Sequence, residues 1–384
     1  MTQFSTLAPV VKQFRTRLTT RLTTRLTSRS TTRAERRPVT RLVPRLSLRL
    51  SLSVALAVVA MTQVGTAQAA TPVKFVMDWA FDGPQAIWTA AVKDGCFEKE
   101  NLDLKIDRGF GSSDSIGKVA SGAYDIGVAD FSSVVAYNAA HPDNPLQVVF
   151  VVSDRSPTSV TVMKSSGITS PKQLAGKRIA DSQGEASRVL FPAFAKANGI
   201  DPASVTWVSV APNLRQSSLL QDKADAAAGH MFTVQSGMKA LNVPADKTFT
   251  MEYAKYGVDV PGSSVIVKAA WAQAHPEAVR GFLSCAADGV KASIADPKAA
   301  LATLHAYNSM LDDGPEAESL DFSTRYAILT PRVLTSGLST VTAGRYDHVL
   351  EMISSSLGVP QPPLNAIWNG SYLPPTSVLK VSAK

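Results

Sequence analysis

The sequence predicts an α/β protein built from two doubly wound lobes, joined by a hinge that the chain crosses twice. Two segments of similar pattern support this, VASGAYDIGVAD at 119–130 and LLQDKADAAAGH at 219–230. Each segment begins with the end of a predicted helix, followed by a turn and an aspartate. A short strand of small residues comes next and ends at a polar side chain, Asp130 or His230. Ligands in open α/β sheets sit outside the carboxyl ends of the strands, so two such units indicate two similar lobes around one cleft. A chance match of two short segments is the alternative.

Strands and helices alternate along the first lobe, as parallel βαβ units require. An apolar run predicts the first strand at 73–77, and a helix with one apolar face follows at 85–94 and ends at Gly95. Further strands are predicted at 102–106, 126–129 and 146–152, with a helix that begins near Ser112 between the first two.

A second cycle of the same kind begins near residue 169. It has predicted strands at 178–181, 205–210 and 226–228 and predicted helices at 185–198, 213–221 and 233–241. An apolar strand at 263–268 returns the chain to lobe one, and helices are predicted at 276–294, 297–307, 316–329 and 344–357. The predicted division is a leader and signal peptide at 1–69, lobe one at 70–165, lobe two at 166–262, and the second part of lobe one with a helical C-terminal segment at 263–384. Two crossings suit closure of the lobes around a ligand.

The positive charge of the chain is concentrated before residue 50. Residues 1–50 contain eleven Arg, one Lys and one Glu, whereas the whole chain has a formal net charge of +8, so residues 71–384 carry −3. A nucleic-acid partner for this part of the chain therefore lacks electrostatic support.

The residues before Ala70 have the organisation of an export signal. Three arginines between 41 and 49 precede an apolar stretch at 51–61 that is too short to span a bilayer, and AQA at 67–69 fits the small-x-small rule for cleavage between Ala69 and Ala70. No cysteine near this point offers a lipid-attachment site, so we expect a protein free in a periplasm. For the Arg-rich first 40 residues, an organellar transit peptide and a start codon assigned too early are alternatives.

The chain has two cysteines, Cys96 and Cys285, both in segments assigned to lobe one. In an oxidising compartment they can pair. The alternative, which the sequence favours, is a pair of buried small apolar side chains. No His/Cys cluster has metal-ligand spacing, and we expect no metal and no cofactor.

Candidate ligand-binding residues gather at predicted strand ends and helix starts. Ser112 and Ser113 head a helix after glycines, where free N–H groups and the helix dipole can hold an anion or carbonyl; the alternative is a plain N-cap. Glu185, Ser187 and Arg188 occupy the matching place in lobe two. There Ser187 can donate to a ligand, while Arg188 can pair with a carboxylate or sulfonate, pair with Glu185, or lie on a solvated helix face.

Aromatic and acidic side chains complete the predicted cleft. The ring of Trp79, just after the first strand, can stack on a flat ligand or pack between the lobes. Phe131 and Phe232 are expected to form walls of the cleft. Asp130 and His230, at the strand ends, are expected to contact the ligand or the closing lobe. Unless Arg188 or a helix terminus offsets their charge, Asp82 and Asp130 disfavour a strongly anionic ligand, and they suit an amine or amidine hydrogen. The predicted site is Trp79, Asp82, Gln85, Ser112, Ser113, Asp130, Phe131, Glu185, Ser187, Arg188 and His230.

Several longer segments resemble a known family. They are Asp78-Trp79, GFGSSDS at 109–115, GAYDIGVAD at 122–130, SPKQLAGKRIADS at 170–182 and NGIDPASVTWVSV at 198–210. In this combination the chain looks like the type II periplasmic substrate-binding proteins of ABC importers, in the branch that binds sulfonates, nitrate, taurine and thiamine-pyrimidine precursors. The resemblance implies a monomer that captures a small polar molecule, heteroaromatic or a carboxylate or sulfonate, and delivers it to an inner-membrane permease.

The pyrimidine-binding members of that family follow Asp-Trp with an Asn and then a His, where this chain has Asp82 and Gln85. A cysteine-rich motif of pyrimidine-synthesising relatives is also absent from the sequence, which weakens a pyrimidine ligand. The sequence contains no Gly-x-Ser-x-Gly, no phosphate loop and no His-Glu-x-x-His, so we expect a binding protein and not an enzyme. A sensor that docks on a membrane receptor and a pyrimidine-biosynthesis enzyme of the same fold are the alternatives.

Overall fold

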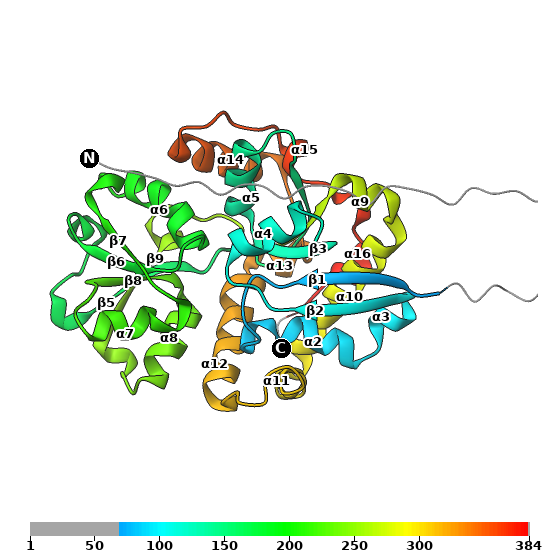
Figure 1. The fold of residues 1–384 in the computed structure, drawn as a ribbon, viewed down its shortest axis with the longest axis horizontal. Coiled ribbons are helices and arrows are strands. Elements are labelled where there is room, and N and C mark those ends of the chain that lie inside the picture. Colours follow the sequence, from blue (N-terminus) through cyan, green and yellow to red (C-terminus); the bar gives the residue numbers. More distant parts are fainter. Residues whose placement is uncertain (1–68, 383–384) are drawn as a thin grey trace, which may run out of the picture. The chain divides into compact units, whose positions relative to one another are not determined.

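The computed structural model describes residues 69–382, so the predicted leader and signal peptide lie outside the described residues except for Ala69. The described chain forms two five-stranded sheets, each with helices on both faces (Figure 1). This is the two-lobed α/β architecture that the sequence predicts. Within the described range, each helix is too short or too polar to cross a membrane.

The first sheet has the strand order β2-β1-β3-β10-β4. Its strands are β1 (Thr71–Val76), β2 (Leu102–Asp107), β3 (Ile126–Asp130), β4 (Leu146–Val151) and β10 (Ser263–Lys268). β1 runs parallel to β2 and β3, whereas β10 runs antiparallel to β3 and β4. The sheet is therefore mixed and not all-parallel, because β10 enters it as the chain returns from the second sheet.

The second sheet repeats this order as β7-β6-β8-β5-β9. Its strands are β5 (Thr158–Met163), β6 (Arg178–Asp181), β7 (Thr206–Ser209), β8 (Ala226–His230) and β9 (Thr248–Glu252). β8 takes the place of β3 and β5 that of β10, so Asp130 lies opposite Ser263 and His230 opposite Thr158. The two similar sequence segments thus end at equivalent positions of equivalent strands.

The strands β5 and β9 and the helix α5 (Phe131–Ala140) are among the elements that were not predicted from the sequence. The division at residue 165 assigns β5 to the first lobe, but β5 pairs antiparallel with β8 and β9 of the second sheet. Its place is set by long-range pairing, which the sequence pattern does not reveal.

Helices cover both faces of each sheet. In the first part of the chain these are α2 (Ala86–Lys93), α3 (Cys96–Lys99), α4 (Ser112–Ala120) and α5, and in the second lobe α6 (Ala186–Ala197), α7 (Arg215–Leu220) and α8 (Met231–Ala240). In Figure 1 α6 lies over one face of the second sheet, and α7 and α8 lie over the other. Both faces are therefore shielded, and the strand ends remain free to form a site.

The C-terminal part of the described chain is helical. Its helices are α9 (Ala269–Ala274), α10 (Pro276–Ala295), α11 (Pro297–Leu304), α12 (Asp313–Ser323), α13 (Pro331–Ser336), α14 (Ala343–Leu357), α15 (Leu364–Ile367) and α16 (Thr376–Leu379). α10 and α11 pack on α2 of the first lobe, but α12 also contacts α8 and α14 contacts α6. The predicted C-terminal segment on lobe one therefore also reaches the second lobe.

The two crossings between the sheets lie side by side. Gly262 N–H donates to the Ser153 carbonyl at 2.9 Å, and Ser156 N–H to the Val260 carbonyl at 2.7 Å. The buried Asp154 of the first crossing accepts hydrogen bonds from Arg332 Nε at 2.8 Å and Arg345 Nη1 at 2.5 Å. These arginines connect the hinge to α13 and α14.

Cys96 and Cys285 form a disulfide, with their Cα atoms 5.6 Å apart. The favoured sequence interpretation, two unlinked apolar side chains, is therefore wrong. The pairing follows from packing of α3 against α10, which brings together two residues separated by 189 positions.

Candidate functional site

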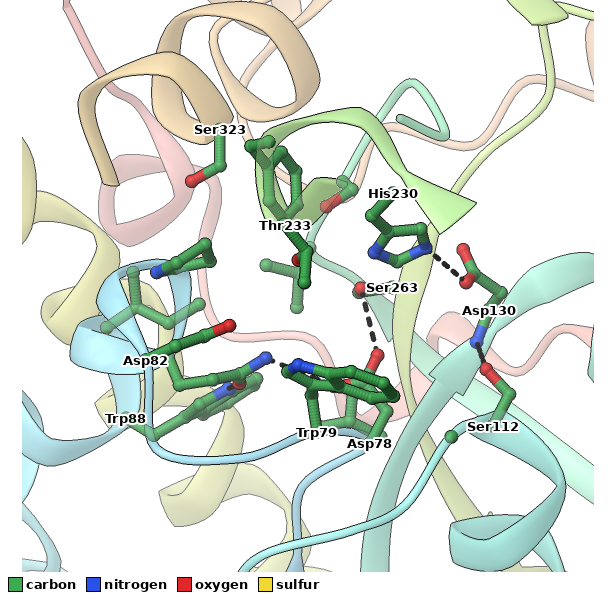
Figure 2. Close-up of a pocket in the computed structure, with 18 of the residues that line it drawn as sticks. Asp78, Trp79, Asp82, Trp88, Ser112, Asp130, His230, Thr233, Ser263 and Ser323 are labelled. Carbon is green, nitrogen blue, oxygen red and sulfur yellow. Dashed lines mark hydrogen bonds and ion pairs between the residues drawn. The ribbon is translucent and has the colours of Figure 1, made fainter. Parts of the chain in front are cut away.

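A small cavity lies between the two lobes, at the ends of β1, β3 and β8. Figure 2 shows Asp78, Trp79 and Trp88 along one side of it and Thr233 and Ser323 on the other. Its volume is about 50 Å³, and one water needs roughly 10–15 Å³ on such a measure, so it has room for a few water-sized groups. The lining includes seven predicted site residues, Trp79, Asp82, Gln85, Ser112, Asp130, Glu185 and His230.

Asp130 and His230 join the lobes at the cavity. His230 Nε2 lies 2.9 Å from Asp130 Oδ2, and the Asp130 N–H donates to Ser112 Oγ at 3.0 Å (Figure 2). Burial lowers the pKa of His230, but the Asp130 carboxylate outweighs it and raises the pKa to about 9. The imidazolium–carboxylate pair therefore links the two strand ends at neutral pH.

This pair gives stability a specific pH dependence. Native His230 keeps a proton that the unfolded chain has already released, so the free energy of unfolding is expected to fall as the pH rises from about 6.5 toward 9. His230→Gln is expected to flatten this fall in urea titrations at several pH values. The exposed His348, 3.8 Å from Glu351, provides the control: His348→Gln should keep the fall. An undiminished fall in His230→Gln would contradict the assignment.

Asp78 stands at the centre of a hydrogen-bonded chain that the sequence analysis did not include in the site. It accepts from Gln85 Nε2 at 3.2 Å and from Ser263 Oγ at 3.3 Å, and Gln85 Oε1 in turn accepts from Trp88 Nε1 at 3.0 Å. Burial, with a smaller contribution from the Asp130 charge, raises the pKa of Asp78 to about 6. The Asp-Trp pair after the first strand was the signal that could have identified it.

Asp82 has an unpartnered oxygen. Its Oδ1 is buried without a hydrogen-bond partner, and burial, followed by the charges of Glu316 and Asp78, raises the pKa of Asp82 well above its usual value. The neighbouring Gly83 N–H donates to Glu316 Oε2 at 2.5 Å, which holds this turn against α12. Asp130 Oδ1 is likewise buried without a partner. Two cavity-lining carboxyl groups thus have an oxygen without a hydrogen-bond partner.

Arg215, at the start of α7, is a buried cation that sequence reasoning missed. Its side chain is 1% exposed, and Nη2 donates to Glu185 Oε1 at 2.6 Å and lies 3.4 Å from Asp181 Oδ1. Its guanidinium also lies 5.9 Å from the ring centre of Trp79 in the first lobe. Burial raises the pKa of Asp181, although the Arg215 charge opposes this rise. No local signal marks this arginine, because its partners lie about 30 residues earlier in the chain.

Glycines allow the close approach of these groups. A Cβ on Gly229, whose φ is +154°, would lie 2.2 Å from Arg215 Nη1. Across the lobes, Ser113 N–H and Oγ donate to the Gly184 carbonyl at 3.3 and 3.1 Å. The start of α4 is therefore occupied by a contact with the other lobe, and Ser113 lies outside the cavity lining.

Three other predicted site residues do not line the cavity. Phe131 is fully buried and packs edge-on against Tyr346, because α5 begins at Phe131 and directs its ring into the core. Ser187 is buried and donates to Asp181 Oδ2 at 2.8 Å, so it orders an acidic neighbour of the cavity. Arg188 lies over the ring of Trp207 at 5.0 Å and donates to Ser209. Phe232, in contrast to Phe131, is among the residues that line the cavity.

The cavity contains two cations whose charges are already matched. His230 pairs with Asp130, and Arg215 pairs with Glu185 and Asp181, while Asp78 and Asp82 have no cation within the ion pairs of the described residues. An added anion would lie beside Asp78 and Asp82, whose charged forms burial already disfavours, whereas an N–H or ammonium group would complement them. The described residues include no group of three or more His, Cys, Asp or Glu placed to hold a metal ion.

Comparisons with known proteins agree with this architecture. The family described as NMT1/THI5 like matches residues 84–300. The 4-amino-5-hydroxymethyl-2-methylpyrimidine phosphate synthase of Legionella pneumophila is 27% identical over 157 residues, 41% of this chain and 48% of that protein. The taurine-binding periplasmic protein of Escherichia coli is 28% identical over 208 residues, 54% and 63% respectively. The chain thus spans about half to two thirds of these curated relatives.

Solved structures show the fold more completely. The alkanesulfonate-binding protein SsuA from Xanthomonas axonopodis pv. citri, bound to MOPS, superimposes with a TM-score of 0.60 at 14% identity, covering 79% of this chain and 99% of that one. The Escherichia coli aliphatic sulphonate binding protein SsuA gives 0.60 at 14% identity, with 78% and 92% covered. The fold is that of the periplasmic binding proteins, as the resemblance implies.

Proposed function

The chain belongs to the NMT1/THI5-like family, and from this premise we propose that it is the solute-binding component of an ABC importer, capturing a small nitrogen-containing molecule without net negative charge. The observation that carries the proposal is the pair of unpartnered acceptor atoms, Asp82 Oδ1 and Asp130 Oδ1, on residues that line the interlobe cavity. Buried acceptors without donors are costly, and a ligand N–H group would remove that cost.

Other features of the cavity support a flat, amine- or amidine-bearing ligand. Trp79, from the first lobe, forms an aromatic wall of the cavity. The guanidinium of Arg215, from the second lobe, lies over its ring. Arg215 Nε is also buried without a hydrogen-bond partner and can donate to a ring nitrogen or an oxygen of the ligand. A heteroaromatic amine uses all three atoms, and a zwitterion such as taurine also satisfies the charge condition. A simple sulfonate or carboxylate, which the sequence analysis kept as a possible ligand, carries a net negative charge and does not meet this condition.

The importer role places the protein in a periplasm, as a monomer with an inner-membrane permease as partner. The named binding relative is periplasmic, and the predicted signal peptide is consistent with export. The synthase relative favours a second function, pyrimidine synthesis. We place it second because both cysteines of the chain are joined in a disulfide and neither lines the cavity, which leaves no thiol for chemistry there.

Thermal denaturation with a ligand panel tests the proposal. We expect aminopyrimidines or taurine, but neither methanesulfonate nor nitrate, to raise the melting temperature. A ligand at 100 times its dissociation constant adds about 2.7 kcal/mol, which corresponds to several degrees for a protein of this size. Asp82→Asn and Trp79→Ala should abolish the rise, while the exposed Asp143→Asn should keep it. Stabilisation by the simple anions alone would overturn the proposed ligand class.

A further inference from the structure

A second, larger hollow lies between α8 and β9 of the second lobe and α12. Its volume is about 590 Å³, within the range of small-molecule sites, whereas the central cavity has about 50 Å³. We call it the α8–α12 groove. It is lined by Phe232, Gln235, Ser236, Met238, Lys239, Val243, Pro244, Ala245, Thr248, Thr250, Pro315, Glu318, Ser319 and Phe322.

The groove has a different chemistry from the cavity. Its charged groups are Lys239 and Glu318, which form an ion pair with each other across the two helices. The remaining lining is uncharged, with apolar surface from side chains such as Met238, Val243 and Phe322 and hydroxyl groups between them. Such a surface suits an alkyl or aryl group and offers no counter-charge to an ionic one.

Groove and cavity share a wall. Phe232, 8% exposed, lines both. Its neighbour Thr233 faces the cavity, as does Ser323 at the end of α12, whereas Phe322 faces the groove (Figure 2 shows Thr233 and Ser323 at the cavity). One turn of α8 and one turn of α12 thus have residues facing the cavity and residues facing the groove. The side chain of Phe232 lines both.

We propose that the α8–α12 groove is the second compartment of the ligand site and holds an uncharged alkyl or aryl arm of a ligand whose polar nitrogenous head occupies the central cavity. This rests on the proposed function. The cavity has room for a few water-sized groups, so a larger ligand must extend past Phe232. Phe232 is then the specificity-determining residue that sets the size of the arm.

Methionine-methyl NMR on the full chain tests binding in the groove independently of the nitrogenous head of the ligand. Benzyl alcohol is the probe, because it represents the aryl arm without the head. It is expected to shift the Met238 methyl saturably and to leave Met231 unshifted, because Met231 is fully buried on the same helix outside the groove lining. Ser236→Trp, which fills the groove, should abolish the Met238 shift. Ala240→Trp, on an exposed position of α8 outside the lining, should preserve it.

Titration calorimetry then tests the connection between the compartments. A 4-aminopyrimidine with a 5-benzyl arm is expected to bind at least tenfold tighter than the unsubstituted 4-aminopyrimidine, and Ser236→Trp should remove that advantage without changing the affinity for the unsubstituted compound. Absence of a saturable Met238 shift, or equal affinities for the two pyrimidines, overturns the second compartment. Failure of the unsubstituted pyrimidine to bind, with the Met238 shift present, counts against the proposed ligand class and supports the groove.

Discussion

Arg215→Met is expected to lower the free energy of unfolding by roughly 3–5 kcal/mol, the cost of leaving buried carboxylates without their cation. Arg215 is 1% exposed and is the ion-pair partner of both Asp181 and Glu185, so its loss leaves two buried carboxyl groups without their cation. Methionine keeps much of the side-chain volume, which separates the loss of charge from the loss of packing. Urea denaturation at pH 7 measures the effect.

The control is an arginine of the same lobe whose own side chain is exposed. Arg178 pairs with Asp225 at 2.9 Å, but its side chain is 44% exposed, so Arg178→Met is expected to cost about 1 kcal/mol or less. The deficit of Arg215→Met should also shrink at acid pH, because a protonated Asp181 no longer needs a cation. A loss in Arg215→Met no larger than in Arg178→Met would show that the buried cluster is not held by this cation.

Removal of the Cys96–Cys285 disulfide is expected to cost about 2–5 kcal/mol. The bond joins residues 189 positions apart, and the enclosed chain contains the whole second sheet, so it restricts the unfolded chain across both lobes. The Cys96→Ser/Cys285→Ser double variant should show a lower melting temperature than the oxidised protein.

Reducing agent provides the matched test of the disulfide. It should bring the unmodified chain down to the melting temperature of the double variant and leave the double variant unchanged. Insensitivity of the unmodified chain to complete reduction, verified by thiol counting, would contradict a stabilising role. Reduction should leave the cavity lining intact, since neither cysteine belongs to it.

Much of the fold could be predicted because it depends on local patterns. Apolar runs and helical periodicity identified β1, β2, β3, β4 and β10 in the first sheet. The strand β5 escaped because three of the six residues of Thr158–Met163 carry hydroxyl groups and the segment has no continuous apolar run, although it is almost entirely buried. The antiparallel direction of β10 was also not predicted. The direction of pairing depends on how the preceding chain connects the strands, here through the second sheet, and not on the residues of the strand itself.

The candidate site residues at strand ends could be placed from the sequence, whereas those whose position depends on distant partners could not. Asp130 and His230 were identified from two similar segments, and they meet at 2.9 Å. Phe131 and Trp79 both follow strands as aromatic residues, yet one ring enters the core and the other lines the cavity. Helix packing around each ring decides this outcome.

By itself the sequence determined the two-lobed α/β architecture, the equivalence of the two strand ends and the membership of Trp79, Asp82 and Asp130 in the cleft lining, because strand ends and helix starts are set by neighbours along the chain. Only the tertiary structure decided the Cys96–Cys285 bond and the burial of Arg215 against Asp181 and Glu185. These pairings join residues about 30 to 190 positions apart. The disulfide acts through chain closure, and the buried ion pairs act through charge attraction that offsets the cost of desolvation. Neither contribution is encoded in a local pattern of residues.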